Sequence, residues 1–281
     1  MRDQSAEKKE KDENDPEELA RAWDWHVRRK AAWNGTTPEK VLDALSRDGV
    51  QWVREAVAGN ARASAAALAR LAEDSSGYVR AAVALNSRAT SELLEMLAAD
   101  EMVDYDSTLH KNRYLVKEAA AKSPNINTRT LAYLARDADD HVRAAAASNP
   151  LLPAESMSRM VKDIFWEARN NIAKNPSTPE ELLVYLSLDR IMDVRMTAAQ
   201  NPRMPAQALA SLAADKSWEV REALARNGSL DGRILDELAG HWSWMVRAAV
   251  AENPNTPAET LKRLAGDQDQ SVQKAARGRI G

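Results

Sequence analysis

The sequence predicts an all-α solenoid of about nine tandem repeats, each 26 residues long and made of two short helices. The repeat is visible in a Val-Arg pair that recurs along the chain, with Asn six residues after the Arg. Only 5% of the residues are aromatic although 44% are hydrophobic, and such an Ala- and Leu-rich chain favours packed helices over strands. The column that contains the Arg reads Arg28, Arg54, Arg80, Lys117, Arg143, Arg169, Arg195, Arg221, Arg247 and Gln273.

Three further columns keep the same spacing. With the residue before each Arg taken as position 1, position 8 is Asn in every repeat except the one with Ser123 and the last, incomplete one with Arg279. Position 22 is Asp in every complete repeat except the one with His241. Leu or Met fills positions 16 and 19 throughout, as at Leu183 and Leu186. The Asp column reads Asp48, Asp74, Asp100, Asp137, Asp163, Asp189, Asp215 and Asp267.

The first half of each repeat predicts a helix, which we call helix A. Its apolar residues stand at helical spacing in one narrow stripe, as at Val246, Val250 and Ala251. We expect the helix to end at the Asn, here Asn253, because Asn tolerates the left-handed backbone conformation that closes helices. The Pro that often follows, here Pro254, discourages continuation of the helix.

The second half predicts another helix, helix B. In the clearest repeats it is preceded by Thr-Pro, as at Thr256 and Pro257, which we expect to act as an N-cap followed by Pro at the first helical position. The Leu pair, here Leu261 and Leu264, lies on one helical face and faces the core, and the helix stops near Asp267. Helices this short are unstable alone and must stack on their neighbours.

Both ends of the repeat array and one interval inside it depart from the pattern. Residues 1–16 are densely charged and are predicted to be disordered. A helix over 17–33, which carries Trp23 and Trp25, is expected to cap the array and merge into the first repeat, so that the solenoid covers 27–281. The step from Arg80 to Lys117 is 37 residues, which places an insertion of eleven residues within 101–115.

Charge and composition exclude several classes of function. The net charge is −3, but residues 1–20 contain four basic and eight acidic side chains, which leaves 35 basic and 34 acidic groups in the body. The basic excess typical of nucleic-acid binders is missing. The chain has no Cys, no pair of His at metal-binding spacing and no Gly-rich phosphate loop. With no long apolar stretch either, we expect a cytoplasmic protein without membrane, metal or cofactor.

The combination of Asp, Val-Arg, an Ala-rich helix, Asn-Pro, Thr-Pro and Leu-x-x-Leu-Ala resembles the leucine-rich repeat variant family of bacterial proteins. Residues 246–267, VRAAVAENPNTPAETLKRLAGD, show it best, and the match extends over about 27–277. The resemblance implies a HEAT-like, right-handed superhelix in which one helix of each repeat can be 3₁₀. The family's best-known member holds an iron–sulfur cluster on a Cys-rich segment, and this Cys-free chain cannot carry that cluster over.

The repeated Arg and Asp are predicted to be structural, since a residue present in every repeat is required by the repeat itself. We expect the Arg at position 2 to bond the Asp at position 22 and carbonyls at helix ends, because one guanidinium can serve several acceptors. The Asn column is expected to shape the turns. The predicted ladder includes Arg54, Arg80, Arg143, Arg195, Arg221 and Arg247 with Asp74, Asp100, Asp137, Asp189 and Asp215.

Functional residues are therefore sought where the repeats differ. Aromatic residues gather at positions 25 and 26, just before helix A, where His141 also falls. Stacked along a solenoid they would form a stripe that contacts a peptide, nucleobases or sugars. The alternative is that each ring covers only the seam between its own repeat and the next. This aromatic column contains Trp52, Tyr78, Tyr114, Trp166, Trp218 and Trp244.

The insertion is the second departure from the repeat. Insertions in solenoids map to loops on one face, often the binding face. Three readings stay open for it: a simple polar loop, a ligand contact made by Lys111, Arg113 and Tyr114, or an active site. The acid and base groups that would serve an active site are Asp104, Asp106, His110 and Lys111.

Three classes of function follow from this pattern. A non-enzymatic scaffold that binds a protein or peptide along the solenoid is favoured by the repeats and by the nearly neutral body. Nucleic-acid binding, as in the similar HEAT-like alkylpurine DNA glycosylases, is the alternative, supported by the Trp residues and opposed by the missing basic excess. An enzyme built on the insertion is the third.

Overall fold

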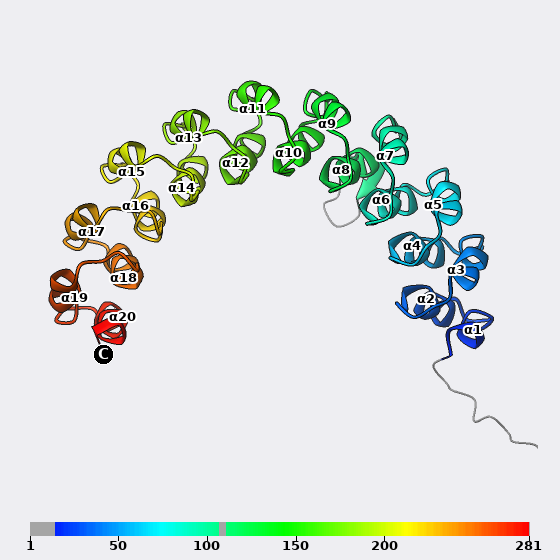
Figure 1. The fold of residues 1–281 in the computed structure, drawn as a ribbon, viewed down its shortest axis with the longest axis horizontal. Helices are drawn as coiled ribbons and strands as arrows, with labels where there is room; N and C mark the ends of the chain where they lie inside the picture. Colours follow the sequence, from blue (N-terminus) through cyan, green and yellow to red (C-terminus); the bar gives the residue numbers. More distant parts are fainter. Residues whose placement is uncertain (1–14, 107–110, 281) are drawn as a thin grey trace, which may run out of the picture. The chain divides into compact units, whose positions relative to one another are not determined.

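The computed structural model describes residues 15–106 and 111–280, and in this part of the chain it contains twenty helices and two short strands. The helices follow one another as the repeat predicts, and within each unit successive A helices contact one another (Figure 1). The chain divides into two compact units, residues 1–130 and 131–281, and each is described by itself. The boundary falls inside helix α9.

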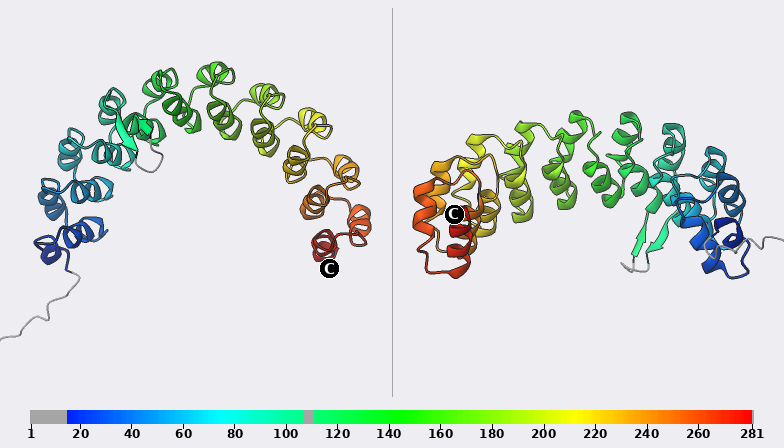
Figure 2. Two further views of the ribbon diagram at one scale, coloured as in Figure 1. Left: turned by 180° about the vertical axis from the view of Figure 1, so that it is seen from behind. Right: turned by 60° about the horizontal axis from the view of Figure 1, so that its bottom comes forward.

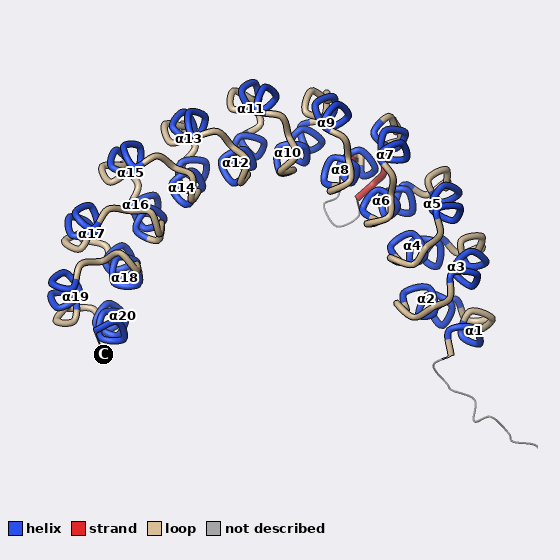
Figure 3. Tube along the Cα trace, viewed as in Figure 1, coloured by secondary structure: helices blue, strands red, loops and turns tan. Residues whose placement is uncertain are grey.

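In unit 1 the even-numbered helices, which are the A helices, form one row, and the odd-numbered B helices from α3 onward form a second (Figure 3). The elements of unit 1 are α1 (Pro16–Leu19), α2 (Trp25–Trp33), α3 (Glu39–Leu45), α4 (Gln51–Gly59), α5 (Ala65–Leu71), α6 (Gly77–Leu85), α7 (Ser91–Ala98), β1 (Asp104–Asp106), β2 (Lys111–Arg113), α8 (Leu115–Lys122) and the first part of α9 (Thr128–Leu134).

Unit 2 repeats the same alternation of helices A and B without interruption. Its elements are α10 (Asp140–Ser148), α11 (Ala154–Met160), α12 (Trp166–Lys174), α13 (Glu180–Leu186), α14 (Met192–Gln200), α15 (Ala206–Leu212), α16 (Trp218–Ala225), α17 (Gly232–Leu238), α18 (Trp244–Glu252), α19 (Ala258–Leu264) and α20 (Gln270–Ile280).

The core lies between the two rows of helices. The Leu or Met residues at positions 16 and 19 are buried in every repeat, as are the Val or Ala residues at position 1 from α4 onward. Small Ala side chains such as Ala56 and Ala58 are also buried and let successive A helices approach closely. In the described residues both helices of each repeat are α-helices, and neither is the 3₁₀ helix that the resemblance allowed. Hydrogen bonds of the 3₁₀ type, from residue i to residue i−3, occur at helix ends, such as Asp74 N–H to Leu71 O.

The Thr of each Thr-Pro pair does not act as the expected N-cap. Helix α3 begins at Glu39 without a side-chain cap, and the Thr37 hydroxyl instead donates to the carbonyl of Ala31 at 2.6 Å. Thr178 and Thr256 make the same bond back to helix A. The physical reason is that the last carbonyls of helix A have no partner within the helix, and the buried hydroxyl satisfies one of them.

The Asn column also works differently from the expectation of a left-handed turn. Asn60 has φ −78° and ψ 125°, an extended conformation. Its side-chain Nδ2 donates to Ala32 O at 2.7 Å and Asn34 O at 3.1 Å, both at the end of the preceding A helix, while its Oδ1 accepts the N–H of Arg62 at 2.8 Å. The Asn column therefore links successive repeats through hydrogen bonds, which explains why Asn recurs along the array.

The N-terminal region forms two helices where a single one was expected over 17–33. Helix α1 contacts α2, and the chain breaks between them because Asp24 caps α2 by accepting the N–H of His26 at 2.9 Å. Helix α2 is itself the A helix of the first repeat. Trp23 lies in the break and is 97% exposed. Residues 1–14, which include most of the charged tail, lie outside the described residues.

Candidate functional site

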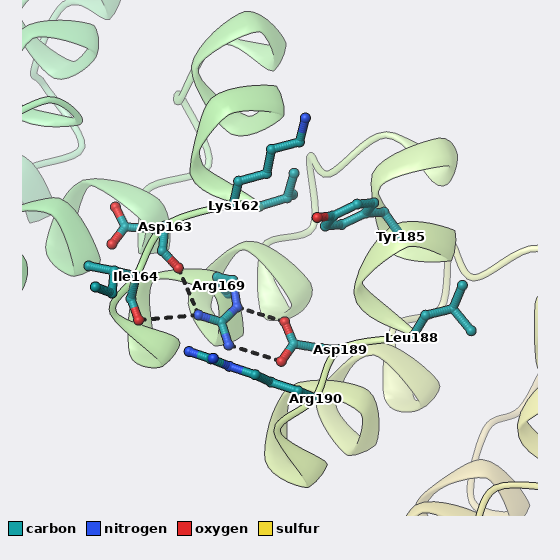
Figure 4. A pocket seen from close by; sticks show the side chains of 9 residues that line it. Lys162, Asp163, Ile164, Arg169, Tyr185, Leu188, Asp189 and Arg190 are labelled. Carbon is teal, nitrogen blue, oxygen red and sulfur yellow. Dashed lines mark hydrogen bonds and ion pairs between the residues drawn. The ribbon is translucent and has the colours of Figure 1, made fainter.

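The Arg and Asp columns form a ladder of paired side chains in both units. In Figure 4 the Arg169 guanidinium donates to Asp189 through Nε at 2.6 Å and Nη2 at 2.9 Å, and through Nη1 to the carbonyl of Asp163 at 2.7 Å. Each Arg thus joins the Asp of its own repeat to the backbone of the preceding repeat. The same carboxylate contact joins Arg28 to Asp48, Arg54 to Asp74, Arg80 to Asp100, Arg143 to Asp163, Arg195 to Asp215 and Arg247 to Asp267.

His241 replaces the Asp in one rung, and its ring cannot accept hydrogen bonds from both of the donors that face it. The N–H of Ser243 donates to His241 Nδ1 at 3.0 Å, and Arg221 Nη1 lies 3.0 Å from His241 Nε2. A neutral imidazole accepts through one ring nitrogen only, so these two donors compete for one acceptor. Protonation gives no relief, because a protonated imidazole donates from both ring nitrogens. Burial and the charge of Arg221 also lower the pKa of His241.

Replacing His241 by Asp is expected to stabilise the protein. A carboxylate accepts the Ser243 N–H and the Arg221 guanidinium together, as Asp267 does for Asp269 and Arg247. Hydrogen bonds to charged groups contribute about 1.5–3 kcal/mol, so we expect a gain of about 1–3 kcal/mol in the free energy of unfolding. Urea unfolding measures it. The control is His241→Asn, which keeps one acceptor but no charge, and an equal gain from Asn would contradict the explanation.

The aromatic column lies at the starts of the A helices, where its rings are partly covered. Trp52, Trp166 and Trp244 are 37–43% exposed, and the other three members of the column are half-buried. The rings of Trp52 and Tyr78 in unit 1 lie 6.4 Å apart. In unit 2 His141 packs edge-on against Phe165 at 5.2 Å. Each ring is therefore partly covered and still presents part of its surface to solvent.

The insertion forms a two-stranded antiparallel hairpin that packs onto unit 1. In Figure 2 its strands β1 and β2 extend away from the helices, and Asp104 pairs with Arg113 in register. Arg113 Nε donates to Glu118 of α8 at 2.8 Å, and Lys117 Nζ donates to Glu101 at 2.8 Å. His110 and the side chains of Asp106 and Lys111 lie outside the described residues.

Asp104 contacts the start of helix α6, where the repeat provides Gly77. A Cβ on Gly77 would overlap the Asp104 carboxylate, and the backbone of Gly77 hydrogen-bonds to it. Gly77 stands at position 25, which Trp166 and Trp218 occupy in other repeats. Burial raises the pKa of Asp104 despite the nearby charge of Arg80. The hairpin thus fills the space that an aromatic side chain takes elsewhere.

Two of the predicted binding residues, Tyr78 and Arg113, line one hollow of about 310 Å³ on the A helices of unit 1. Its other walls include Glu55, Glu118 and the exposed Leu85. Burial raises the pKa of Glu55, although the charge of Arg29 acts against this shift. Tyr114 does not line the hollow and instead lies under Lys117, whose Nζ is 5.0 Å from the centre of the ring.

A larger hollow of about 660 Å³ lies in unit 2, at the edge formed by two successive turns from helix B to helix A. Ile164 lies in the first turn and is 83% exposed, while Leu188 lies in the second turn and is 77% exposed. Tyr185 of α13 completes the apolar lining (Figure 4). The Arg169 and Asp189 pair lines it together with three other charged residues, so the hollow lies directly over the ladder.

The predicted site did not contain Ile164, Tyr185 or Leu188. A signal for two of them was present in the columns, because Ile164 is at position 23, where most repeats have Gly, Ser, Ala or a charged residue. Trp242 takes the same position three repeats later and is 76% exposed. Leu188 likewise stands in a column otherwise filled by charged residues, Ala and Gly.

The repeats, the ladder and the core between the helix rows of each unit define a solenoid of helical repeats. Residues 244–269 match the family described as leucine rich repeat variant. Residues 246–267, which carry the resemblance in the sequence, lie within the matched range, so the similarity to this family covers one repeat. A solved structure described as a leucine-rich repeat variant with a novel repetitive protein structural motif is 24% identical, with a TM-score of 0.58, over 84% of this chain and 89% of that chain.

Two other solved structures align over most of the chain. YibA from E. coli is 15% identical over 83% of this chain and 97% of its own, with a TM-score of 0.46, and an engineered protein is 17% identical over 94% and 97%, with a TM-score of 0.37. Comparison with curated protein sequences finds no significant match. Within residues 15–106 and 111–280, none of the helices combines the length and apolar character needed to cross a bilayer.

Proposed function

We propose that the protein is a non-enzymatic interaction scaffold and that the hollow at Ile164 and Leu188 binds a peptide segment of a partner protein. The supporting observation is the pair of almost fully exposed aliphatic side chains beside a hollow. Exposed apolar patches next to concave surfaces mark interaction sites, and a volume near 660 Å³ is within the usual range for ligand pockets. The aromatic column, with Trp166 next to this edge, extends the proposed contact surface.

The ladder of Arg and Asp pairs gives this surface a rigid base. Arg169 is 5% exposed and holds both turns, through the carbonyl of Asp163 on one side and the carboxylate of Asp189 on the other. A preorganised surface loses little conformational freedom on binding, which favours affinity. The proposed binding function therefore depends on the ladder without using it for contact.

A selection from a random peptide library displayed on phage, with the full chain as bait, tests this function. We expect recovered peptides to bind the Ile164→Ala/Leu188→Ala variant at least about tenfold more weakly, because each apolar side chain buried in an interface contributes about 1–3 kcal/mol. The matched control is Leu151→Ala, which removes another exposed Leu of unit 2 outside the hollow.

Nucleic-acid binding is the competing outcome. Gel-shift titrations of the same protein with single- and double-stranded DNA and RNA at low salt would detect it. Retention of nucleic acid together with an empty peptide selection would contradict the proposal. Equal loss of binding in the Leu151→Ala control would contradict the assignment to the hollow.

A further inference from the structure

The charges around the hollow in unit 2 are not balanced. Five charged side chains line it, three basic and two acidic. Lys162 and Arg190 are exposed, and neither side chain forms a hydrogen bond or ion pair within the described part of the chain. They lie on opposite sides of the central Arg169 and Asp189 pair in the view of Figure 4. The hollow thus presents two cations that are available to a ligand.

The two carboxylates of the lining are already occupied. Asp163 accepts from Arg143 Nε at 2.7 Å and Nη2 at 2.9 Å, and from the N–H of Phe165 at 2.9 Å. Asp189 accepts in the same way from Arg169 and from the N–H of Ile191 at 2.8 Å. Arg190 adds a favourable charge near Asp189 without bonding to it. Neither carboxylate has the freedom to neutralise Lys162 and Arg190.

Acidic residues just beyond the hollow do not cancel this charge. Glu167 and Asp193 lie in the first turns of α12 and α14, where they offset the helix dipoles, and neither lines the hollow. The same edge of unit 2 carries two further exposed cations, Arg136 and Lys216, at the corresponding turns. Exposed cations therefore recur at this edge on both sides of the apolar residues, with Asp139 and Asp140 also following Arg136.

We infer that this hollow recognises an extended acidic peptide segment, with a bulky apolar side chain seated against Ile164 or Leu188 and carboxylates placed at Lys162 and Arg190. This inference rests on the proposed function and specifies the chemistry of the partner. The apolar side chain supplies most of the buried surface, and the flanking charges select the sequence around it. Peptides with basic flanks are rejected by the same two cations.

A phosphate backbone is the less suitable occupant. Nucleic-acid binding relies on many cations in succession and on aromatic platforms for the bases, and the hollow offers two free cations and the aliphatic surfaces of Ile164 and Leu188. Tyr185 is the one ring in its lining. A mixed aliphatic and cationic surface matches an acidic peptide more closely in both shape and charge.

Fluorescence anisotropy with three labelled peptides of about ten residues tests the inference. The first contains Glu and Asp around a central Leu, the second replaces that Leu by Ser, and the third replaces the acidic residues by Lys and Arg. We expect the first to bind at least about tenfold more tightly than the others at low salt, and to weaken at high salt because exposed charge pairs are screened.

The Lys162→Glu/Arg190→Glu variant is expected to lose about tenfold or more in affinity for the acidic peptide. Lys174→Glu/Lys274→Glu is the matched control, because it changes the net charge equally at two exposed Lys residues outside the hollow. Thermal unfolding followed by circular dichroism verifies that both variants fold. An equal loss of affinity in the control would overturn the assignment to this hollow.

The composition of the displayed peptides separates this inference from the function on which it rests. Peptides that require Ile164 and Leu188 but carry neutral or basic flanks would overturn the inference and leave the scaffold function in place. An oligonucleotide that displaces the acidic peptide at lower concentration than unlabelled peptide would also overturn it. Failure to recover any peptide would refute both proposals together.

Discussion

The Asp215→Ala variant is expected to lose about 3–5 kcal/mol in its free energy of unfolding, because removing one partner of a buried ion pair leaves the other charge unpaired. Arg195 is 5% exposed and donates to Asp215 at 2.7 and 2.9 Å. Its remaining bond, to the carbonyl of Asp189 at 2.9 Å, cannot neutralise the guanidinium. Asp215 also accepts the N–H of Ser217 at 2.9 Å, which loses its partner as well. Chemical denaturation measures the loss.

A double variant distinguishes an unpaired charge from a general loss of packing. In Arg195→Met/Asp215→Leu both charges are replaced by apolar groups, and such replacements of buried pairs are often neutral or stabilising. We therefore expect the double variant to be more stable than Asp215→Ala alone. If it is less stable, the rung contributes more through its hydrogen-bonding geometry than through charge balance, and the predicted origin of the loss is wrong.

Acidification is expected to unfold the protein through the same ladder. The pKa values of six carboxylates are lowered in the folded state: Asp48, Asp74, Asp163, Asp189, Asp215 and Asp267. At the first five, burial is the largest single influence and acts to raise the pKa, but the hydrogen bonds from the Arg partner and from backbone N–H groups together outweigh it. At Asp267 the hydrogen bond from Arg247 is the largest influence on the pKa.

The sign of this dependence follows from proton linkage. A lowered pKa means that the folded protein binds fewer protons than the unfolded chain, whose Asp residues titrate near about 3.9, so the stabilisation is complete above that pH and is lost as pH falls through the folded-state values. We expect the free energy of unfolding, measured in urea between neutral pH and about pH 2, to fall steeply below about pH 4. Asp215→Asn should show a shallower fall, since it removes one titrating rung. A stability that does not change over this range would contradict the role given to the ladder.

The architecture was predictable because the repeat brings the same residue types to the same positions many times. The pairing of Arg54 with Asp74 follows from two columns at a fixed distance, since a buried Arg needs an acceptor and the Asp column is the recurrent acid. The burial of the Leu pairs follows from their helical spacing. A pattern that is ambiguous in one short helix becomes clear when the same residue types recur at the same positions in many repeats.

The parts that were not predicted depend on contacts between repeats. The column pattern shows that Asn60 is required, but not that its side chain reaches the carbonyl of Ala32 in the preceding repeat. The bond from Thr37 to Ala31 competes with an N-cap of similar strength, and only the packed structure decides between them. The hollow was missed because exposure of Ile164 depends on the turn that carries it, and a single sequence gives no measure of that.

The bonds between repeats also have a consequence for how the chain folds. A ladder bond joins residues 20 positions apart, such as Arg54 and Asp74, and an Asn bond joins residues 26 or 28 apart, such as Asn60 with Asn34 and Ala32. Closing such short loops costs little entropy, and proteins dominated by local contacts fold rapidly. A partly folded array of a few adjacent repeats already contains complete rungs, so within each unit folding can start at any repeat and spread to its neighbours.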